Sequence, residues 1–151
     1  MKDHFINLLT YNNWANQRAF ASIVDTFGID ERAYELLSHI IAAQKIWLSR
    51  IQSNGDNPIS SWAKFDKKEL LMLLNNVHND WMTYISESND EQYGLTINYK
   101  NSRGEEHTKK IKDVITHVFN HSTYHRGQIA IIVKACGGVP AVTDYIFYVQ
   151  G

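Results

Sequence analysis

The stretch HVFNHSTYHRGQ, residues 117–128, places three histidines four residues apart in a longer run of apolar residues. That run covers residues 112–136 and is followed by Gly137, Gly138 and Pro140, which typically end a helix. Its apolar residues recur every three or four positions and predict an amphipathic helix with one face on a core. A helix that needed only a core would carry Leu or Ile at the histidine positions, so the histidines need a further reason.

Two of these histidines fall on the apolar side of the predicted helix. At about 100° per residue, His125 lies within the apolar arc, His121 lies at its edge, and His117 lies roughly 60° outside it. Two imidazoles one turn apart on a shared face can both bind one divalent ion. The alternative is that they are ordinary core or surface histidines, and seven histidines in the chain make a coincidental spacing easier. The arc is formed by Ile111, Val114, Ile115, Val118, Ile129, Ile132 and Cys136.

A third metal ligand is expected from another helix, because helical bundles build their sites from facing helices. His39 lies on the flank of a second apolar stripe, beside Leu36 and Ala43, where an interhelical contact is reasonable. Three histidines with one or two waters would form the open coordination that is typical of catalytic zinc. We expect the remaining histidines to be solvated or to lie in a hairpin, and not to bind metal: His4, His78 and His107.

The residues around His125 leave several interpretations open. No acid lies between the two histidines at the place where the zinc-protease motif keeps its base, which disfavours protease chemistry. Gly127, in mid-helix, either permits close approach by another helix or opens space beside His125. Arg126 and Gln128 either support the site or an interface, or are solvated or salt-bridged.

Three further helices are predicted by the same spacing, over about residues 3–25, from Asp30 to the Ser53-Asn54-Gly55 stop, and from 66 to about 87. The third begins at a stretch that resembles a capping box, Asp66 to Glu69. Residues 57–65 form a loop, and alternating residues from Leu95 to Ile111 predict a small hairpin. The chain is therefore expected to be one all-α domain over residues 1–151, a four-helix bundle with a β-hairpin between helices three and four.

The composition of the chain limits which binding partners and which cellular compartment we expect. The net charge of −1 lacks the basic excess that nucleic-acid binding needs. Cys136 is the only cysteine, so an intrachain disulfide and an all-thiolate zinc site are excluded. No stretch approaches the roughly 20 apolar residues that span a bilayer, and the first residues lack the apolar run of a signal peptide. We expect a cytoplasmic protein that binds neither nucleic acid nor membrane.

Together with YNNWANQ at residues 11–17 and SHIIAAQKIW at residues 38–47, the 117–128 stretch resembles the DinB/YfiT-like family. That family includes damage-inducible proteins and bacillithiol- and mycothiol-dependent S-transferases. The resemblance implies an up-down-down-up bundle, often a homodimer, with a divalent metal held by three histidines, here His39, His121 and His125. It also implies zinc or nickel, between which imidazole donors alone do not decide. Trp14, Trp47 and Tyr124 match aromatic positions of the family, and we expect them to pack in the core.

Two classes of function follow from this interpretation. The first is a divalent-metal-dependent enzyme acting on a small molecule, either a thiol S-transferase using a low-molecular-weight thiol or a hydrolase. The second is a non-catalytic stress-response protein that binds metal for stability or presents a surface to a partner. A binding pocket that reaches an open coordination position would favour the first.

Overall fold

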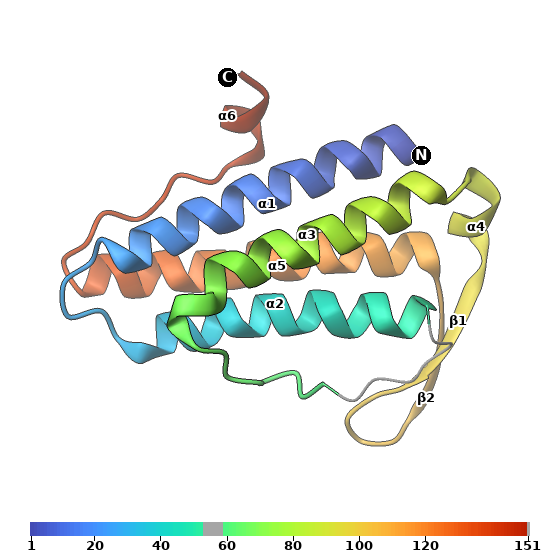
Figure 1. Cartoon of the computed structure of the whole chain (residues 1–151), viewed down its shortest axis with the longest axis horizontal. Coiled ribbons are helices and arrows are strands. Elements are labelled where there is room, and N and C mark those ends of the chain that lie inside the picture. Colours follow the sequence, from blue (N-terminus) through green and yellow to red (C-terminus); the bar gives the residue numbers. More distant parts are fainter. Residues whose placement is uncertain (53–58, 151) are drawn as a thin grey trace.

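The computed structural model describes residues 1–52 and 59–150 and consists of four long helices, a hairpin and short helical segments (Figure 1). The long helices and the hairpin match their predicted positions, so these predictions are confirmed. The predicted stop at residues 53–55 lies outside the described residues. The elements are α1 (Lys2–Val24), α2 (Glu31–Gln52), the 3-10 turn η1 (Lys67–Glu69), α3 (Leu70–Glu87), α4 (Asp90–Gly94), β1 (Thr96–Lys100), β2 (Glu106–Lys110), α5 (Ile111–Ala135) and α6 (Tyr145–Gln150).

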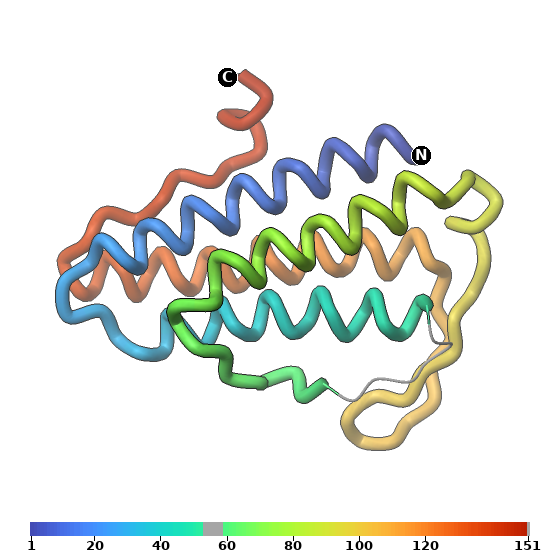
Figure 2. The backbone as a smooth tube through the Cα atoms, viewed as in Figure 1, coloured from blue at the N-terminus to red at the C-terminus, as the bar shows by residue number. Residues whose placement is uncertain are grey.

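The four long helices have the up-down-down-up arrangement that the resemblance implied. Helices α1 and α5 run in one direction, and α2 and α3 run in the other (Figures 1 and 2). Helix α2 packs mainly against α5, while α1 packs against α3 and α5, so that α1 and α2 stand diagonally across the bundle. The antiparallel hairpin, which pairs Thr96 with Lys110 and Lys100 with Glu106, lies at one end. Helices α2 and α5 therefore form one adjacent, antiparallel pair.

Side-chain hydrogen bonds cap the starts of several helical segments, and the sequence predicted only some of these bonds. The Asp30 carboxylate accepts a hydrogen bond from the backbone N–H of Arg32 at 2.8 Å, as expected for the start of α2. The Asp66 carboxylate likewise accepts from Lys68 N–H at 2.9 Å, but this bond begins the 3-10 turn before α3. A complete capping box forms instead at α4, between Asn89 and Gln92.

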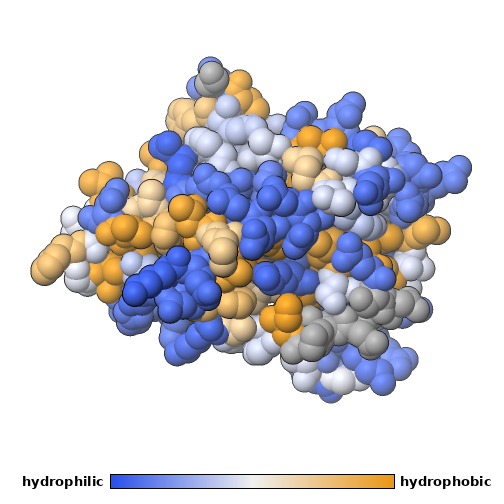
Figure 3. Space-filling model, in the orientation of Figure 1, coloured by the Kyte–Doolittle hydropathy of each residue, from blue (hydrophilic) through white to orange (hydrophobic). Residues whose placement is uncertain are grey.

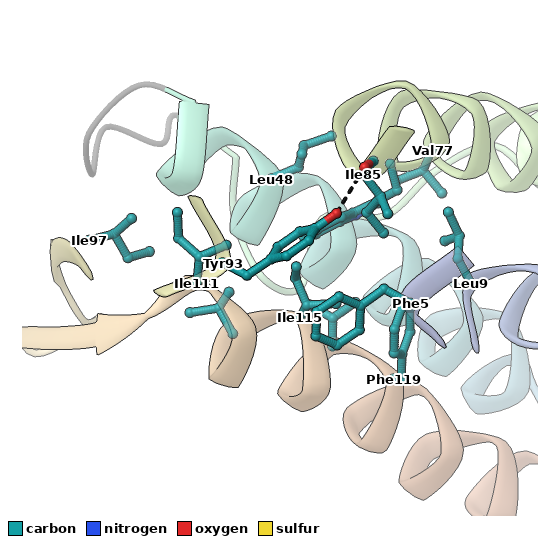
Figure 4. Packing of buried hydrophobic residues seen from close by; sticks show 13 residues of the cluster. Phe5, Leu9, Leu48, Val77, Ile85, Tyr93, Ile97, Ile111, Ile115 and Phe119 are labelled. Atoms are coloured by element: carbon teal, nitrogen blue, oxygen red, sulfur yellow. Dashed lines mark hydrogen bonds between the residues drawn. The ribbon is translucent and has the colours of Figure 1, made fainter. Parts of the chain in front are cut away.

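The core consists of two hydrophobic clusters, one toward each end of the bundle. At the hairpin end, Phe5 contacts the ring of Tyr93 edge-on at 5.2 Å, and the buried Tyr93 hydroxyl donates to Ile85 O at 2.9 Å (Figure 4). Buried Ile111 and Ile115 of α5 complete this cluster. The other cluster contains Ile23, Leu36, Leu37, Ile40, Leu70, Leu74, Ile129 and Val133. Each long helix contributes an apolar stripe to both clusters, as its spacing predicted.

Polar side chains of α1 and α5, most of them buried, form a hydrogen-bonded group around Arg126. Its guanidinium Nη1 donates to Asn12 Oδ1 and to Asn16 Oδ1, each at 2.8 Å. Its Nη2 donates to Thr123 Oγ1 at 2.8 Å and to the Tyr11 hydroxyl at 3.4 Å. We call these five residues the Arg126 network. The network continues across the bundle, because Asn12 donates to Gln44 Oε1 at 3.3 Å and Trp81 Nε1 donates to Gln44 O at 3.1 Å.

The C-terminal segment turns back along α1, a feature that the sequence interpretation missed (Figure 1). Gly137 has a φ of 83°, which favours glycine and ends α5. The Tyr11 hydroxyl donates to Thr143 O at 2.7 Å, and Tyr145 packs edge-on against Tyr11 at 5.0 Å. Helix α6 exposes the apolar residues Ile146, Phe147 and Val149. Figure 3 shows apolar surface at the top of the molecule, where α6 lies in Figure 1.

None of the helices in the described part of the chain combines the length and hydropathy needed to cross a lipid bilayer.

Candidate metal centre

Three histidines from two helices converge where α2 packs against α5. His39 comes from the middle of α2, and His121 and His125 lie one turn apart on α5. The His121 Nε2 atom is 3.1 Å from His39 Nε2 and 3.1 Å from His125 Nε2. One ring nitrogen of each histidine lies within 4.8 Å of those of the others, so these three residues could hold a metal ion. The structure thus brings together the three residues that the sequence favoured.

Hydrogen bonds on the far side of two rings fix which nitrogen carries the proton. His39 Nδ1 lies 2.5 Å from Ser61 O, and a carbonyl oxygen only accepts, so this Nδ1 is the donor. His125 Nδ1 lies 2.7 Å from the side-chain oxygen of Gln128 and donates to it for the same reason. In a neutral imidazole the other nitrogen then carries a lone pair. The Nε2 atoms of His39 and His125 therefore both present lone pairs to His121.

The cluster lacks a donor for at least one of these lone pairs. A neutral His121 has at most one Nε2–H, which can point well at only one of its two neighbours. Burial first, and then the neighbouring histidines, lower the pKa of His121 to about 3, so it does not become a charged bridge at neutral pH. Burial likewise lowers the pKa of His39. A cation between the three Nε2 atoms satisfies all of the lone pairs, so this donor set fits a divalent metal.

The described segment after residue 58 covers one side of the cluster. The indole of Trp62 stacks on the His39 ring at 3.9 Å with an interplanar angle of 11°. The Arg32 guanidinium lies 4.7 Å from the centroid of the Trp62 ring. Trp62 itself is 47% exposed. The sequence analysis missed Ser61 and Trp62, because no spacing rule links a loop to a helix 22 residues before it.

His117 lies outside the cluster, as the helical wheel predicted. It is exposed, and its ring packs against Trp47 at 5.3 Å and against His121 at 5.5 Å. Aromatic contacts continue from Trp47 to Tyr99 of the hairpin at 4.9 Å. Arg50 lies over both of these rings, 4.6 Å from the Trp47 centroid and 4.5 Å from the Tyr99 centroid. A row of rings thus leads from the cluster to the hairpin.

A cavity of about 1000 Å³ opens beside this row. It is bordered by Arg50 of α2, by Tyr99 and His107 of the hairpin, and by Ser60 and Ser61. Ser61 is also the residue whose carbonyl holds His39, so the cavity and the cluster share a wall. A small molecule bound there would lie near the cluster, against aromatic and basic groups.

Of the other predictions for residues around the centre, the structure confirms one and contradicts three. Gln128 supports His125, which confirms one of the two alternatives for that residue. Arg126 is buried, so its solvated alternative is wrong. For Gly127, the close approach of another helix is wrong, because a Cβ there would meet nothing within 4 Å. Tyr124 is 65% exposed, so its expected core position is wrong, because it lies on the outer side of α5.

The remaining aromatic and histidine predictions agree with the structure only in part. Trp47 is half-buried and packs against the core cluster at the hairpin end, whereas Trp14 is half-buried against Tyr148 and belongs to neither core cluster. His4 is exposed and His107 lies in the hairpin, as predicted. His78 is half-buried, and its buried Nδ1 has no hydrogen-bond partner in the described residues, so its predicted solvated position is wrong.

Comparison with known proteins finds a family model that matches most of this chain and a similar protein. The model of the DinB family matches residues 29–151. The chain is also similar to Protein DinB of Bacillus subtilis (strain 168), with 24% identity over 166 residues. That alignment covers 98% of this chain and 95% of the relative, so the similarity includes the segments that carry all three histidines.

Proposed function

This chain belongs to the DinB family, and from that premise we propose that it is a divalent-metal-dependent enzyme acting on a small molecule. Its reaction is thiol S-transfer or hydrolysis, and His39, His121 and His125 are its metal ligands. The observation that carries the proposal is the convergence of Nε2 atoms 3.1 Å apart, two of them held as lone-pair donors by hydrogen bonds on the opposite ring nitrogen. Zinc and nickel both suit imidazole donors.

Three protein ligands support catalysis more than a purely structural role. Structural zinc sites are usually closed by four protein ligands, whereas catalytic sites keep one position for water or substrate. A divalent ion bound here would lower the pKa of a thiol or a water at that position and so supply a nucleophile at neutral pH.

The surrounding residues hold and shield the ligands. The Ser61 carbonyl and the Gln128 side chain fix the ring orientation of His39 and His125, which raises the basicity of their Nε2 atoms. Trp62 covers one face of His39 and keeps bulk water from it. The neighbouring cavity supplies a place for the substrate, with Arg50 between the rings of Trp47 and Tyr99 and available to an anionic group.

A second candidate function is a non-catalytic metal-binding or interaction protein in a stress response. It is favoured by one observation: in the described residues, the cluster contains three histidines and no carboxylate that could serve as a general base. Thiol transfer needs such a base least, because a metal-bound thiol is already deprotonated. Of the two enzyme reactions, the cluster therefore favours thiol transfer.

The test is an activity assay on protein reconstituted with zinc or nickel. Cysteine as the thiol and chlorodinitrobenzene as the electrophile report S-transfer, in which the thiolate sulfur replaces chloride on the ring. A p-nitrophenyl ester reports hydrolysis. We expect turnover that requires metal, is lost in His121→Ala and is retained in His117→Ala. Stoichiometric metal binding with rates no higher than those of the free ion would favour the non-catalytic alternative.

A further inference from the structure

A second cavity, of about 560 Å³, lies on the other side of α5, between α1 and the returning C-terminal segment. It is separate from the metal centre, because α5 turns His125 toward His39 of α2 and Arg126 toward α1. Its lining residues combine one guanidinium with aromatic and small side chains: Leu8, Tyr11, Thr116, Phe119, Asn120, Thr123, Arg126, Gly127, Ala130, Ala141, Thr143, Asp144 and Tyr145.

Arg126 is a buried cation without an anionic partner. The residue is only 3% exposed, and all four of its hydrogen bonds go to neutral acceptors. Its Nε atom is buried and has no hydrogen-bond partner in the described residues. No ion pair of Arg126 is found there either. Buried arginines are almost always paired with a carboxylate or phosphate, so this guanidinium is short of one anion.

The cavity beside Arg126 has room for an anion with an apolar body. Gly127 contributes no side chain to the wall, and a Cβ built there would meet nothing within 4 Å. The rings of Tyr11, Phe119 and Tyr145 and the side chain of Leu8 provide apolar surface. The volume falls within the usual range for small-molecule sites, which are largely apolar with a few polar groups that orient the ligand.

The charges in the lining limit the ligand to a single negative charge. Among the described residues that line it, Arg126 is the one basic residue, and Asp144, which is exposed, is the one acidic residue. A dianion such as phosphate would leave one more negative charge uncompensated beside Arg126 than a monoanion does, and Asp144 would repel it more strongly. A carboxylate needs only one positive charge, and one of its oxygens can accept from the Nε–H, the guanidinium N–H that has no partner in the described residues.

We propose that this cavity binds a small monocarboxylate, with the carboxylate against Arg126 and an aromatic or aliphatic body against Tyr11, Phe119 and Tyr145. The inference is independent of the proposed metal-dependent function, since it uses none of the three histidines. The site is formed by α1, α5 and the C-terminal segment, so its occupation would fix that segment against the bundle.

The first experiment titrates the full-length protein with benzoate, with benzamide and with inorganic phosphate, followed by amide chemical shifts in NMR. Benzamide has the shape of benzoate without its charge. We expect benzoate to bind roughly tenfold or more tightly than either control, the factor that a charge-assisted hydrogen bond typically adds. Equal binding of benzoate and benzamide, or no shift at about 10 mM benzoate, would overturn the proposal, and tighter binding of phosphate would overturn its choice of a monoanion.

The second experiment blocks the cavity without disturbing Arg126. Gly127→Leu places a side chain into open space and should leave the fold and the metal content unchanged while weakening benzoate binding at least ~tenfold. Gly94→Leu is the matched control, because that glycine is also helical, exposed and free of neighbours within 4 Å. Arg126→Gln should remove the preference for benzoate over benzamide. Undiminished benzoate binding by the folded Gly127→Leu protein would contradict the assigned site.

Discussion

The histidine cluster and the Arg126 network lie side by side on α5, yet they are incomplete in opposite ways. His125 and Arg126 are consecutive residues that project about 100° apart, one toward α2 and the other toward α1. The cluster gathers more nitrogen lone pairs than its N–H groups can satisfy. The network gathers N–H donors whose acceptors are all neutral. One region therefore fits a cation, and the other fits the anion that we propose.

This difference separates ligand binding from structural support. The Arg126 network already satisfies most of its hydrogen bonds and, through Asn12 and Gln44, ties α1 to α2 and α5. It contributes to folding with or without a ligand. The histidines contact one another but do not satisfy one another, so their geometry is best explained by an ion. Substitutions in the two regions should therefore change different measured quantities.

The largest effect is expected at His121. His121→Ala removes a ligand and should weaken metal binding well beyond the ~10- to 100-fold that loss of a supporting group costs, while helical content stays near wild type. Elemental analysis and circular dichroism on the purified variant measure both. His117→Ala is the control on the same helix and should retain metal. Stoichiometric metal in His121→Ala would contradict the proposed ligand set.

The next effect tests the structural side of the comparison. Arg126→Met leaves the buried side-chain carbonyls of Asn12 and Asn16 without their donor and should lower the free energy of unfolding by about 2–4 kcal/mol. Metal content should not change. Urea unfolding of metal-free protein measures the loss, with the exposed Arg103→Met as the matched substitution, expected within about 0.5 kcal/mol of wild type. Equal free energies of unfolding for Arg126→Met and wild type would contradict the stabilising role of the Arg126 network.

A smaller effect on metal binding is expected for substitutions of Gln128, which accepts a hydrogen bond from His125. Gln128→Leu removes the acceptor for the Nδ1–H of His125 and should weaken zinc binding roughly 10- to 100-fold. Gln128→Glu keeps an acceptor oxygen and should bind zinc at least as tightly as wild type. Competition with a chromophoric chelator measures both affinities. If Leu and Glu had the same effect, the hydrogen bond would not orient the ring.

The smallest effect is the dependence of stability on pH. In the folded, metal-free protein, burial lowers the pKa of His39 and lowers that of His121 to about 3, below the ordinary value of 6.5. The unfolded chain therefore binds protons first, and the stabilisation present above about pH 6.5 is lost as the pH falls toward the folded pKa values. Urea unfolding at about pH 7.5, 6 and 5 should show a decline that is shallower in His121→Ala.

Arg126→Met serves as the contrast in the same series. Arginine does not titrate in this pH range, so removing Arg126 should not change how stability depends on pH. The free energy of unfolding of Arg126→Met should therefore run parallel to that of wild type, lower by a constant amount. A wild-type profile that is flat below pH 6.5, or one that His121→Ala leaves equally steep, would contradict the burial of neutral histidines.

The fold and the ligand positions could be predicted because they depend on periodicity. Residues spaced by three and four marked all four long helices, and the same wheel placed His121 and His125 inward and His117 outside. The choice of His39 needed two helices to pack together, which the apolar stripes indicate but do not define. Family resemblance supplied the same residue independently.

What the sequence did not reveal depends on contacts between distant segments. Trp62 and Ser61 reach His39 from a loop, and the C-terminal segment returns to Tyr11 across more than a hundred residues. Arg126 resembled a surface arginine, because its acceptors are neutral asparagines on α1 and no carboxylate at helical spacing marked it. Tyr124 was misplaced because a family's aromatic position does not report which side of the helix it occupies.

Anomalous scattering from crystals grown without added metal or chelator tests whether a single cation lies between His39, His121 and His125. We expect one strong peak about 2.0–2.1 Å from the Nε2 atom of each of the three rings, at an absorption edge that identifies zinc or nickel. A map without a peak there, with the three rings still converging, would contradict it.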